Sequence, residues 1–149
     1  MKYDFDVIGR WRNRDNVEKV VKAIREAGYS CFSFIENDWS HHESWDFSHM
    51  NNNADETMQQ VESLSMDALE LKEIFDRDFN GLKDSRAVVL VLPSGVSSSI
   101  EAGAAYGLGK PVYAVISPDF NLKSEASYLI FNKIFKDVDE FKEFLKEEN

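Results

Sequence analysis

The sequence predicts an α/β protein in which one parallel sheet carries helices on both faces. Short apolar runs alternate with segments whose apolar residues recur at helical spacing, and no repeat or low-complexity linker interrupts this alternation. The run from Ala87 to Leu92 is rich in Val and Leu and ends at Pro93, which is typical of a strand buried on both faces. Right-handed crossovers between successive strands cover both sides of such a sheet. We expect five strands.

The N-terminal part contains a strand, a helix and a second strand. Tyr3 to Ile8 are predicted to form the first strand, and after a loop Asp15 or Asn16 caps a helix that ends at Gly28. The second strand is predicted from Tyr29 to Ile35. The apolar residues of the helix share one face, and they are Val17, Val20, Val21, Ile24 and Ala27.

The rest of the chain continues the alternation. A helix precedes the third strand, Ala87 to Leu92, and Val112 to Ile116 form the fourth strand. A helical turn from Ser124 to Leu129, a short strand from Lys133 to Phe135 and a helix from Asp137 to Glu147 complete the prediction. The helix before the third strand is predicted from its apolar residues, which are Met66, Leu69, Ile74, Phe75, Phe79 and Leu82.

Composition and charge limit the classes of function. With 149 residues, of which 43% are hydrophobic and 13% aromatic, the chain can bury one good core, so we expect a single domain over residues 1–149. The formal charge of −10 repels the backbone of nucleic acids, whose binders present clustered Lys and Arg. We therefore expect no nucleic-acid partner. A small nucleotide remains possible, because one phosphate needs only local donors.

Cysteine usage and the N-terminus bear on location. Cys31 is the only cysteine and lies in an apolar run, which predicts a buried, inert thiol and fits a reducing cytoplasm. The acidic start of the chain is unlike a signal peptide, and no apolar run approaches membrane-spanning length. We expect a cytoplasmic protein without membrane contact.

The segment after the third predicted strand is the most informative about function. Ser97, Ser98 and Ser99 follow the strand, and Glu101 comes two residues later. Unpaired N–H groups at a helix start, serine hydroxyls and the helix dipole all favour a carboxylate or a phosphate there. Glu101 is therefore expected to be ionised at the sheet edge where open α/β folds bind ligands, as a candidate nucleophile or electrostatic stabiliser.

A plain helix start is the alternative interpretation of this segment. The serines would then cap the helix, and Glu101 would only complement the helix dipole. The following residues have little bulk, which favours a helix that lies close to the sheet. These small residues are Ala102, Gly103, Ala104, Ala105 and Gly107.

Two stretches carry a resemblance to a known family. Residues Glu101 to Val112 have the pattern Glu-x-Gly-x-Ala-Tyr-x-Leu-Gly-Lys-Pro-Val, and Ile74 to Ser85 form a predicted helix with an acid ahead of the third strand. With these motifs, most of the chain resembles the nucleoside 2-deoxyribosyltransferase family, which includes nucleoside 5'-monophosphate N-glycosidases. The resemblance implies a flavodoxin-like three-layer sandwich with strand order 2-1-3-4-5 and a homo-oligomer. In that order the loop after Ile8 and the turn after Leu92 face each other and form one pocket.

The resemblance also implies roles for two acids. Glu101 would attack the anomeric carbon of the sugar, and Asp78 would contact the base. An acid that protonates a departing base needs a pKa raised by burial or by a neighbouring carboxylate. The alternative for Asp78 is a solvated helix carboxylate that pairs with Arg77 or Lys83.

Some positions depart from the family pattern. Many members have an acid six residues before the nucleophile, where this chain has Gly95. The surrounding Ser94 and Ser97 to Ser99 resemble the monophosphate N-glycosidase branch, where hydroxyls and amides hold a 5'-phosphate. Asp6 stands where a tyrosine is usual in the transferases, and it would perturb Glu101 if the two carboxylates approach each other.

The loop after the first strand offers cations for a phosphate. Arg10, Arg12 and Arg14 are the candidates, and solvent exposure on a loop is the alternative for each of them. The residues predicted to bind substrate are Gly9, Arg10, Trp11, Ser94, Gly95, Ser97, Ser98 and Ser99.

The stretch from Glu36 to Ala54 is long, polar and aromatic, which is typical of a functional loop. As a lid, it would let Trp39 or Trp45 stack on a base or exclude water; alternatively these rings pack on the sheet edge or at a subunit contact.

The three histidines are spaced irregularly and have no cysteine partner, so we expect no metal site.

The predicted function is cleavage or transfer of the N-glycosidic bond of a nucleoside or nucleoside 5'-monophosphate, without a cofactor. Water as acceptor would make the protein a hydrolase, and a second base would make it a transferase. A noncatalytic nucleotide-binding or sensing module on the same fold is the main alternative. A flavin-binding electron carrier is disfavoured, because the first loop lacks a hydroxyl-rich phosphate cradle.

Overall fold

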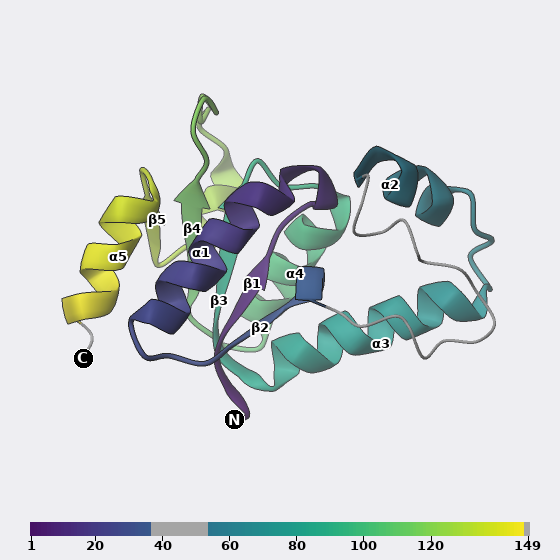
Figure 1. The fold of residues 1–149 in the computed structure, drawn as a ribbon, viewed down its shortest axis with the longest axis horizontal. Coiled ribbons are helices and arrows are strands. Elements are labelled where there is room, and N and C mark those ends of the chain that lie inside the picture. The colour runs from purple at the N-terminus through teal and green to yellow at the C-terminus, as the bar shows by residue number, and fades with distance from the viewer. Residues whose placement is uncertain (37–53, 148–149) are drawn as a thin grey trace.

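The computed structural model describes residues 1–36 and 54–147 and has the predicted α/β architecture (Figure 1). Within these residues, parallel strands form a five-stranded sheet in the order β2-β1-β3-β4-β5, which confirms the order implied by the resemblance. The strands are β1 (Tyr3–Ile8), β2 (Cys31–Ser33), β3 (Ser85–Leu92), β4 (Val112–Ile116) and β5 (Lys133–Phe135). The α-helices are α1 (Arg14–Glu26), α2 (Ala54–Glu62), α3 (Leu69–Lys83), α4 (Val96–Gly107) and α5 (Val138–Glu147). The 3-10 helices are η1 (Trp11–Asn13), η2 (Phe34–Glu36) and η3 (Ala126–Ile130).

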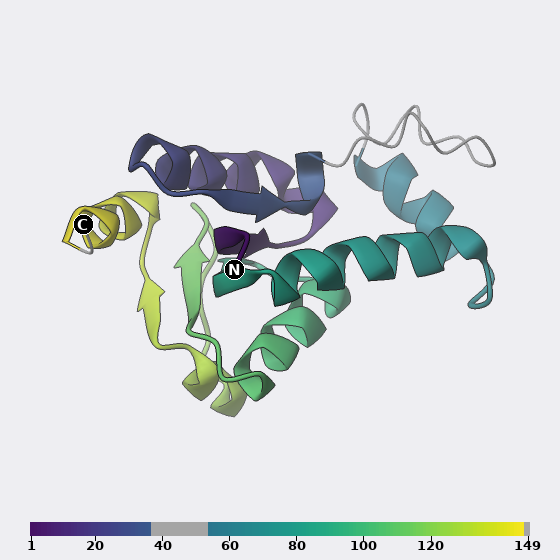
Figure 2. The same cartoon turned by 90° about the horizontal axis from the view of Figure 1, so that it is seen from below.

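The sheet is the middle of three layers, as Figure 2 shows. Helices α1 and α5 cover one face, where Phe5 and Val7 of β1 belong to a buried core with Phe135 and Phe141. Helices α3 and α4 cover the other face, where Ile8 joins a second core. Other members of this second core are Leu82, Val88, Leu90, Leu92, Ala102, Ala105, Val112 and Ala114.

Strand β3 lies at the centre of the sheet, between β1 and β4. Its residues from Ala87 to Leu92 are all buried and alternate between the two cores, which explains the continuous apolar run in the sequence. The order of the strands reverses between β1 and β3, so the connections that leave the carboxyl ends of these strands diverge. This divergence leaves a crevice where open α/β sheets bind ligands.

Several element boundaries differ from the sequence prediction. Strand β2 is shorter than predicted, because the chain turns into η2 at Phe34. Helix α3 begins at Leu69, so Met66 lies outside it and is 90% exposed. Helix α2 was not predicted; together with the first turns of α3 it projects beyond the sheet (Figure 1). Helix α5 begins at Val138, because the Asp137 carboxylate accepts a hydrogen bond from the Glu140 N–H at 2.8 Å and thus caps the helix.

Cys31 is buried in the core on the α1 side of the sheet. Burial raises the pKa of its thiol to about 11, which agrees with the prediction of an inert thiol. In the part of the chain that the structure describes, the helices lack the combination of length and apolar character that a membrane span requires.

Candidate active site

A cavity of about 900 Å³ lies where the loop after β1 faces the turn between β3 and α4. This is the place that the strand order predicts for a pocket. Every residue that the sequence assigned to the site lines this cavity. These residues are Gly9, Arg10, Trp11, Asp78, Ser94, Gly95, Ser97, Ser98, Ser99 and Glu101.

The apolar part of the cavity wall was largely missed by the sequence analysis. It comes from η2, α2, α3 and α4, and its residues are Phe34, Met58, Val61, Ile74, Val96 and Ile100. Met58 and Val61 are three residues apart and so share one side of α2. That spacing is the signal from which an amphipathic helix facing the cavity could have been inferred. An apolar wall of this kind suits the faces of a flat ring.

The start of α4 differs from the predicted serine turn. Gly95 is the N-cap residue, so Ser97, Ser98 and Ser99 lie in the first turn of the helix. The Ser98 hydroxyl is buried and accepts a hydrogen bond from the Gly95 N–H at 3.0 Å, and the Ser99 hydroxyl donates to the Gly95 carbonyl at 2.8 Å. The Ser94 and Ser99 hydroxyls are 2.9 Å apart. Ser98 and Ser99 therefore hold the helix start together, whereas Ser97 is exposed and lines the cavity.

The three candidate arginines have different surroundings. Arg10 lines the cavity, and a Cβ atom on Gly95 would lie 3.4 Å from its Cβ, so the first loop and the start of α4 are in close contact. Arg12 also lines the cavity, but its guanidinium pairs with Asp55 at 2.7 Å and lies 3.9 Å from Glu62, both on α2. Arg14 is the first residue of α1 and is not part of the cavity wall. Arg10 is thus the best-placed cation for an anion at the start of α4.

Glu101 lies on the side of α4 that faces the sheet and is 7% exposed. Its neighbour Ala102 and the nearby Ala105 are buried in the core, and the open space around Gly103 shows that this glycine does not face the sheet. Burial and the charge of Asp78 raise the pKa of Glu101 to about 8. The expectation that Glu101 is ionised at a helix start is therefore wrong at neutral pH. Glu101 is the sixth residue of α4 and lies beyond its first turn, and burial disfavours its charge.

Asp78 lies on α3, half-buried on the cavity wall. Its charge raises the pKa values of both Glu101 and Asp6. Charge interactions therefore link three carboxyls from β1, α3 and α4: Glu101 and Asp78 line the cavity, and Asp6 is not part of its wall. The charge of Glu101 raises the pKa of Asp6, whereas burial and Asp78 are the causes of the Glu101 shift, so an effect of Asp6 on Glu101 stays a prediction.

Asp6 is buried more deeply than the other two acids. It is 1% exposed, and its Oδ2 atom has no hydrogen-bond partner among the described residues. Burial is the largest cause of a pKa raised well above the usual value, and the charges of Glu101 and Asp78 add to it, while Lys110 acts in the opposite direction. Burial at this position thus favours the protonated form of Asp6.

Two predictions fall on residues outside the described ranges. The suggested lid from Glu36 to Ala54, with Trp39 and Trp45, lies almost entirely in 37–53, and so do the three histidines. Among residues 1–36 and 54–147, no group of three or more His, Cys, Asp and Glu side chains is arranged to hold a metal ion.

The fold defines a doubly wound α/β protein, with a cavity at the point where the strand order reverses. No protein-family model and no curated protein matches the sequence. Among solved structures, the chain is similar to a 2-deoxyribosyltransferase from the psychrotolerant bacterium Bacillus psychrosaccharolyticus. The two structures superpose with a TM-score of 0.58 at 16% identity, over 93% of this chain and 90% of that chain. The likeness shows a shared fold.

Proposed function

We propose that the protein cleaves or transfers the N-glycosidic bond of a nucleoside or nucleoside 5'-monophosphate. The observation that carries this proposal is the placement of Glu101 and Asp78 together on the wall of one cavity at the carboxyl edge of β1 and β3. The fold shared with a 2-deoxyribosyltransferase supports it. Most enzymes that hydrolyse glycosidic bonds use a pair of carboxyl groups in one active site.

In the proposed reaction, a carboxylate oxygen of Glu101 attacks C1' of the sugar as the bond from C1' to the base nitrogen breaks. The transition state has oxocarbenium character, so a carboxylate near C1' stabilises the developing positive charge. The product of this step is a glycosyl ester of Glu101. Water then releases the free sugar, or the nitrogen of a second base attacks C1' and forms a new nucleoside.

The proton for the departing base comes from the pair formed by Glu101 and Asp78. Below about pH 8, Glu101 carries a proton beside the Asp78 charge, so the pair holds one proton for use in the reaction. Glu101 passes this proton to Asp78 as it becomes the nucleophile, and Asp78 donates it to the base nitrogen on which negative charge develops. Each carboxyl then has one role, and the total charge of the pair does not change before bond cleavage.

A 5'-phosphate would bind at the start of α4. The N-terminal N–H groups of this twelve-residue helix, the exposed Ser97 and the neighbouring Arg10 offer donors and positive charge there. The buried Ser98 hydroxyl instead binds the N–H of the N-cap residue Gly95, so replacement of Ser98 by Ala is expected to lower stability by about 0.5–1.5 kcal/mol rather than to act on the phosphate alone. The apolar wall that includes Met58 and Val61 would then face the base.

The direct test is incubation of the protein with deoxynucleosides, ribonucleosides and their 5'-monophosphates, with and without a competing free base. Chromatography then follows release or exchange of the base. We expect turnover with at least one of these substrates and loss of turnover in Glu101→Gln, which keeps the shape of the side chain but cannot attack. Full turnover in Glu101→Gln would overturn the mechanism. Binding without turnover would favour the noncatalytic nucleotide-binding module.

A single domain, a cytoplasmic location and a homo-oligomer remain parts of the proposal. Sedimentation of the purified protein tests the oligomer. A hydrolase is distinguished from a transferase by the same chromatographic assay, because only a transferase forms a new nucleoside when a second base is supplied.

A further inference from the structure

Asn13 is the N-cap residue of α1, but its side chain makes no capping hydrogen bond. An asparagine at this position ordinarily accepts a hydrogen bond from an N–H group of the first turn. Here the side-chain oxygen accepts a hydrogen bond from the side-chain amide of Asn16 at 2.8 Å, and the side-chain amide of Asn13 donates to the Ser117 hydroxyl at 3.0 Å. The Asn13 side chain therefore connects two parts of the chain that are far apart in the sequence.

Ser117 directly follows β4 and is buried. Its N–H donates a hydrogen bond of 2.9 Å to the carbonyl of Leu92, the last residue of β3. The Ser117 hydroxyl is therefore held at the carboxyl edge of the sheet, beside the strand from which the chain turns into α4. Neither Asn13 nor Ser117 lines the cavity, so their hydrogen bond lies outside the site.

The hydrogen bond between Asn13 and Ser117 joins the two segments that would hold a phosphate. On one side, the Asn13 N–H donates to the Arg10 carbonyl at 2.9 Å and closes the turn of η1. On the other side, Leu92 lies three residues before Gly95, the N-cap residue of α4. Arg10 and Gly95 are themselves close, because a Cβ atom on Gly95 would lie 3.4 Å from the Arg10 Cβ. The hydrogen bonds therefore fix the first loop relative to the start of α4.

The short helix η1 needs such a connection. A 3-10 helix of three residues has few hydrogen bonds of its own, and their geometry is poor. Trp11 packs its ring edge-on against Phe34, with 5.5 Å between the ring centroids, and this contact holds η1 on the side of η2. The bond from Asn13 to Ser117 holds it on the side of β4. A charge-assisted hydrogen bond from Arg10 to a phosphate depends on this placement, because such bonds are short and directional.

We propose that Asn13 and Ser117 are positioning residues for a 5'-phosphate: their hydrogen bond holds Arg10 where it and the start of α4 bind the same phosphate. This inference rests on the phosphate site of the proposed function. Neither residue contacts the ligand, and each acts through the backbone that it holds. Loss of the bond would leave the phosphate donors present but less well placed, which weakens binding of the phosphate and not of the nucleoside part.

The test measures binding of 2'-deoxyadenosine and of its 5'-monophosphate, which differ only in the phosphate. NMR chemical-shift titration gives both dissociation constants. In Ser117→Ala and in Asn13→Ala, the Kd of the monophosphate should rise about fivefold, the loss expected for one neutral hydrogen bond, and the Kd of the nucleoside should change little. The double variant should bind no more weakly than either single variant, because both changes remove the same bond.

Ser85→Ala is the matched control. Ser85 is also a buried serine, and its hydroxyl donates a hydrogen bond of 2.7 Å to the Gly81 carbonyl, but it lies at the amino end of β3. This variant should lose stability as Ser117→Ala does, and it should bind the monophosphate as the native protein does. A fivefold loss of binding in Ser85→Ala would show that any weakening of the fold impairs binding, and would overturn the proposal.

The proposal is also overturned by an equal rise of Kd for nucleoside and monophosphate, by unchanged binding in Asn13→Ala, or by additive losses in the double variant. If Ser117→Ala does not fold, Asn13→Ala decides alone, since Asn13 is only half-buried. A native protein that binds the monophosphate no more tightly than the nucleoside has no phosphate site, which overturns this inference and leaves the proposed turnover of nucleosides unaffected. Binding without turnover would refute the proposed function and leave this test intact.

Discussion

Glu101 on α4 and Asp78 on α3 share the wall of one cavity, and burial together with the Asp78 charge raises the pKa of Glu101 to about 8. A glutamate with the usual pKa of 4.5 is ionised at neutral pH. Here the sheet beneath the helix removes water from the carboxyl, and the second acid disfavours another negative charge. The result is a pair of acids that keeps one proton over the neutral range, which the proposed reaction requires.

The pH dependence of turnover is the first consequence of this shared proton. For an ordinary nucleoside, the proton of the pair is needed to release the base, so kcat/KM should be level between about pH 6 and 7.5 and should fall above the Glu101 pKa of about 8. For a nucleoside with an N7-methylated purine, the base leaves without protonation. Its kcat/KM should instead rise with pH, about tenfold per unit, and level off above pH 8.

The two profiles are measured on the same protein in the same buffers, which makes each substrate the control for the other. Parallel profiles for the ordinary and the methylated nucleoside would contradict a proton shared between Glu101 and Asp78.

Removal of the Asp78 carboxyl should affect the two substrates in opposite ways. Asp78→Asn cannot donate the proton, so turnover of an ordinary nucleoside should fall by about 100-fold or more, within the usual range for general acid catalysis. The same change removes the charge that opposes ionisation of Glu101. Turnover of the N7-methylated nucleoside at pH 7 should therefore be retained or increased. Equal losses for both substrates would assign Asp78 to binding or structure.

Stability should also depend on the Glu101 carboxyl. The pKa of Glu101 is raised from 4.5 to about 8 in the folded protein. The contribution of this carboxyl to the free energy of unfolding is therefore fully present below pH 4.5, and it is lost as the pH rises to 8. Each unit corresponds to about 1.4 kcal/mol. Glu101→Gln cannot ionise, so at pH 9 its free energy of unfolding should exceed that of the native protein by at least about 1 kcal/mol.

Urea unfolding of both proteins at pH 6 and pH 9 measures this effect. The advantage of Glu101→Gln should be larger at pH 9, and an equal difference at both pH values would contradict burial of an ionisable Glu101.

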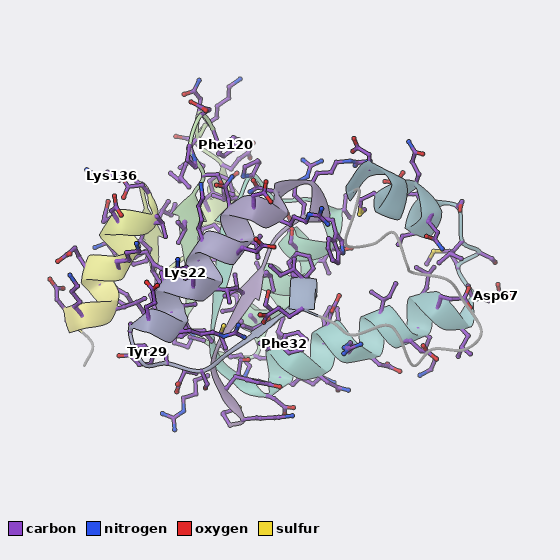
Figure 3. All side chains as sticks on the ribbon, viewed as in Figure 1. Lys22, Tyr29, Phe32, Asp67, Phe120 and Lys136 are labelled. Atoms are coloured by element: carbon purple, nitrogen blue, oxygen red, sulfur yellow. The ribbon has the colours of Figure 1, made fainter. Side chains whose placement is uncertain are left out.

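Two glycines test the packing of the helices that hold the acids. A Cβ atom on Gly81 of α3 would lie 2.3 Å from the ring of Phe32, which is labelled beside α3 in Figure 3. Gly81→Ala should therefore lower the free energy of unfolding by about 1–3 kcal/mol. Gly103 of α4 faces open space, so Gly103→Ala should raise it by about 0.5–1 kcal/mol. Thermal unfolding compares both variants, and a stable Gly81→Ala would show that Phe32 can move aside.

The sheet was predictable because its strands are signalled locally. The bounds of β1, β4 and β5 agree with the predicted ranges, since apolar runs and turn residues mark them clearly. Helix α2 was missed, because Met58 and Val61 are a weak helical signal within an otherwise mostly polar segment. The strand order came from the resemblance of the Glu101 to Val112 segment and not from spacing.

The site was predicted as a set of residues but not in its ionisation. Asp6, Asp78 and Glu101 are far apart in the sequence, and each has an ordinary local context. Their pKa shifts arise from burial and from one another's charge, which exist only after β1, α3 and α4 have packed together. In the same way, the sequence offered three arginines as cations for a phosphate, and the ion pairs of Arg12 with α2 distinguish it from Arg10 only in the folded chain.

Arg10 and Arg12 form a matched pair for testing a 5'-phosphate. Arg10 lies beside Gly95 at the start of α4, so Arg10→Gln should raise KM for a nucleoside 5'-monophosphate by about tenfold or more, as expected for loss of a charge-assisted hydrogen bond. KM for the matching nucleoside should change little. Arg12→Gln should have a smaller effect on the monophosphate, because the Arg12 guanidinium is already paired with Asp55. Steady-state kinetics on both substrates measures the four values. An equal rise for nucleoside and monophosphate in Arg10→Gln would remove the phosphate from the proposal, whereas a larger rise in Arg12→Gln would mean that Arg12 leaves α2 to bind the ligand.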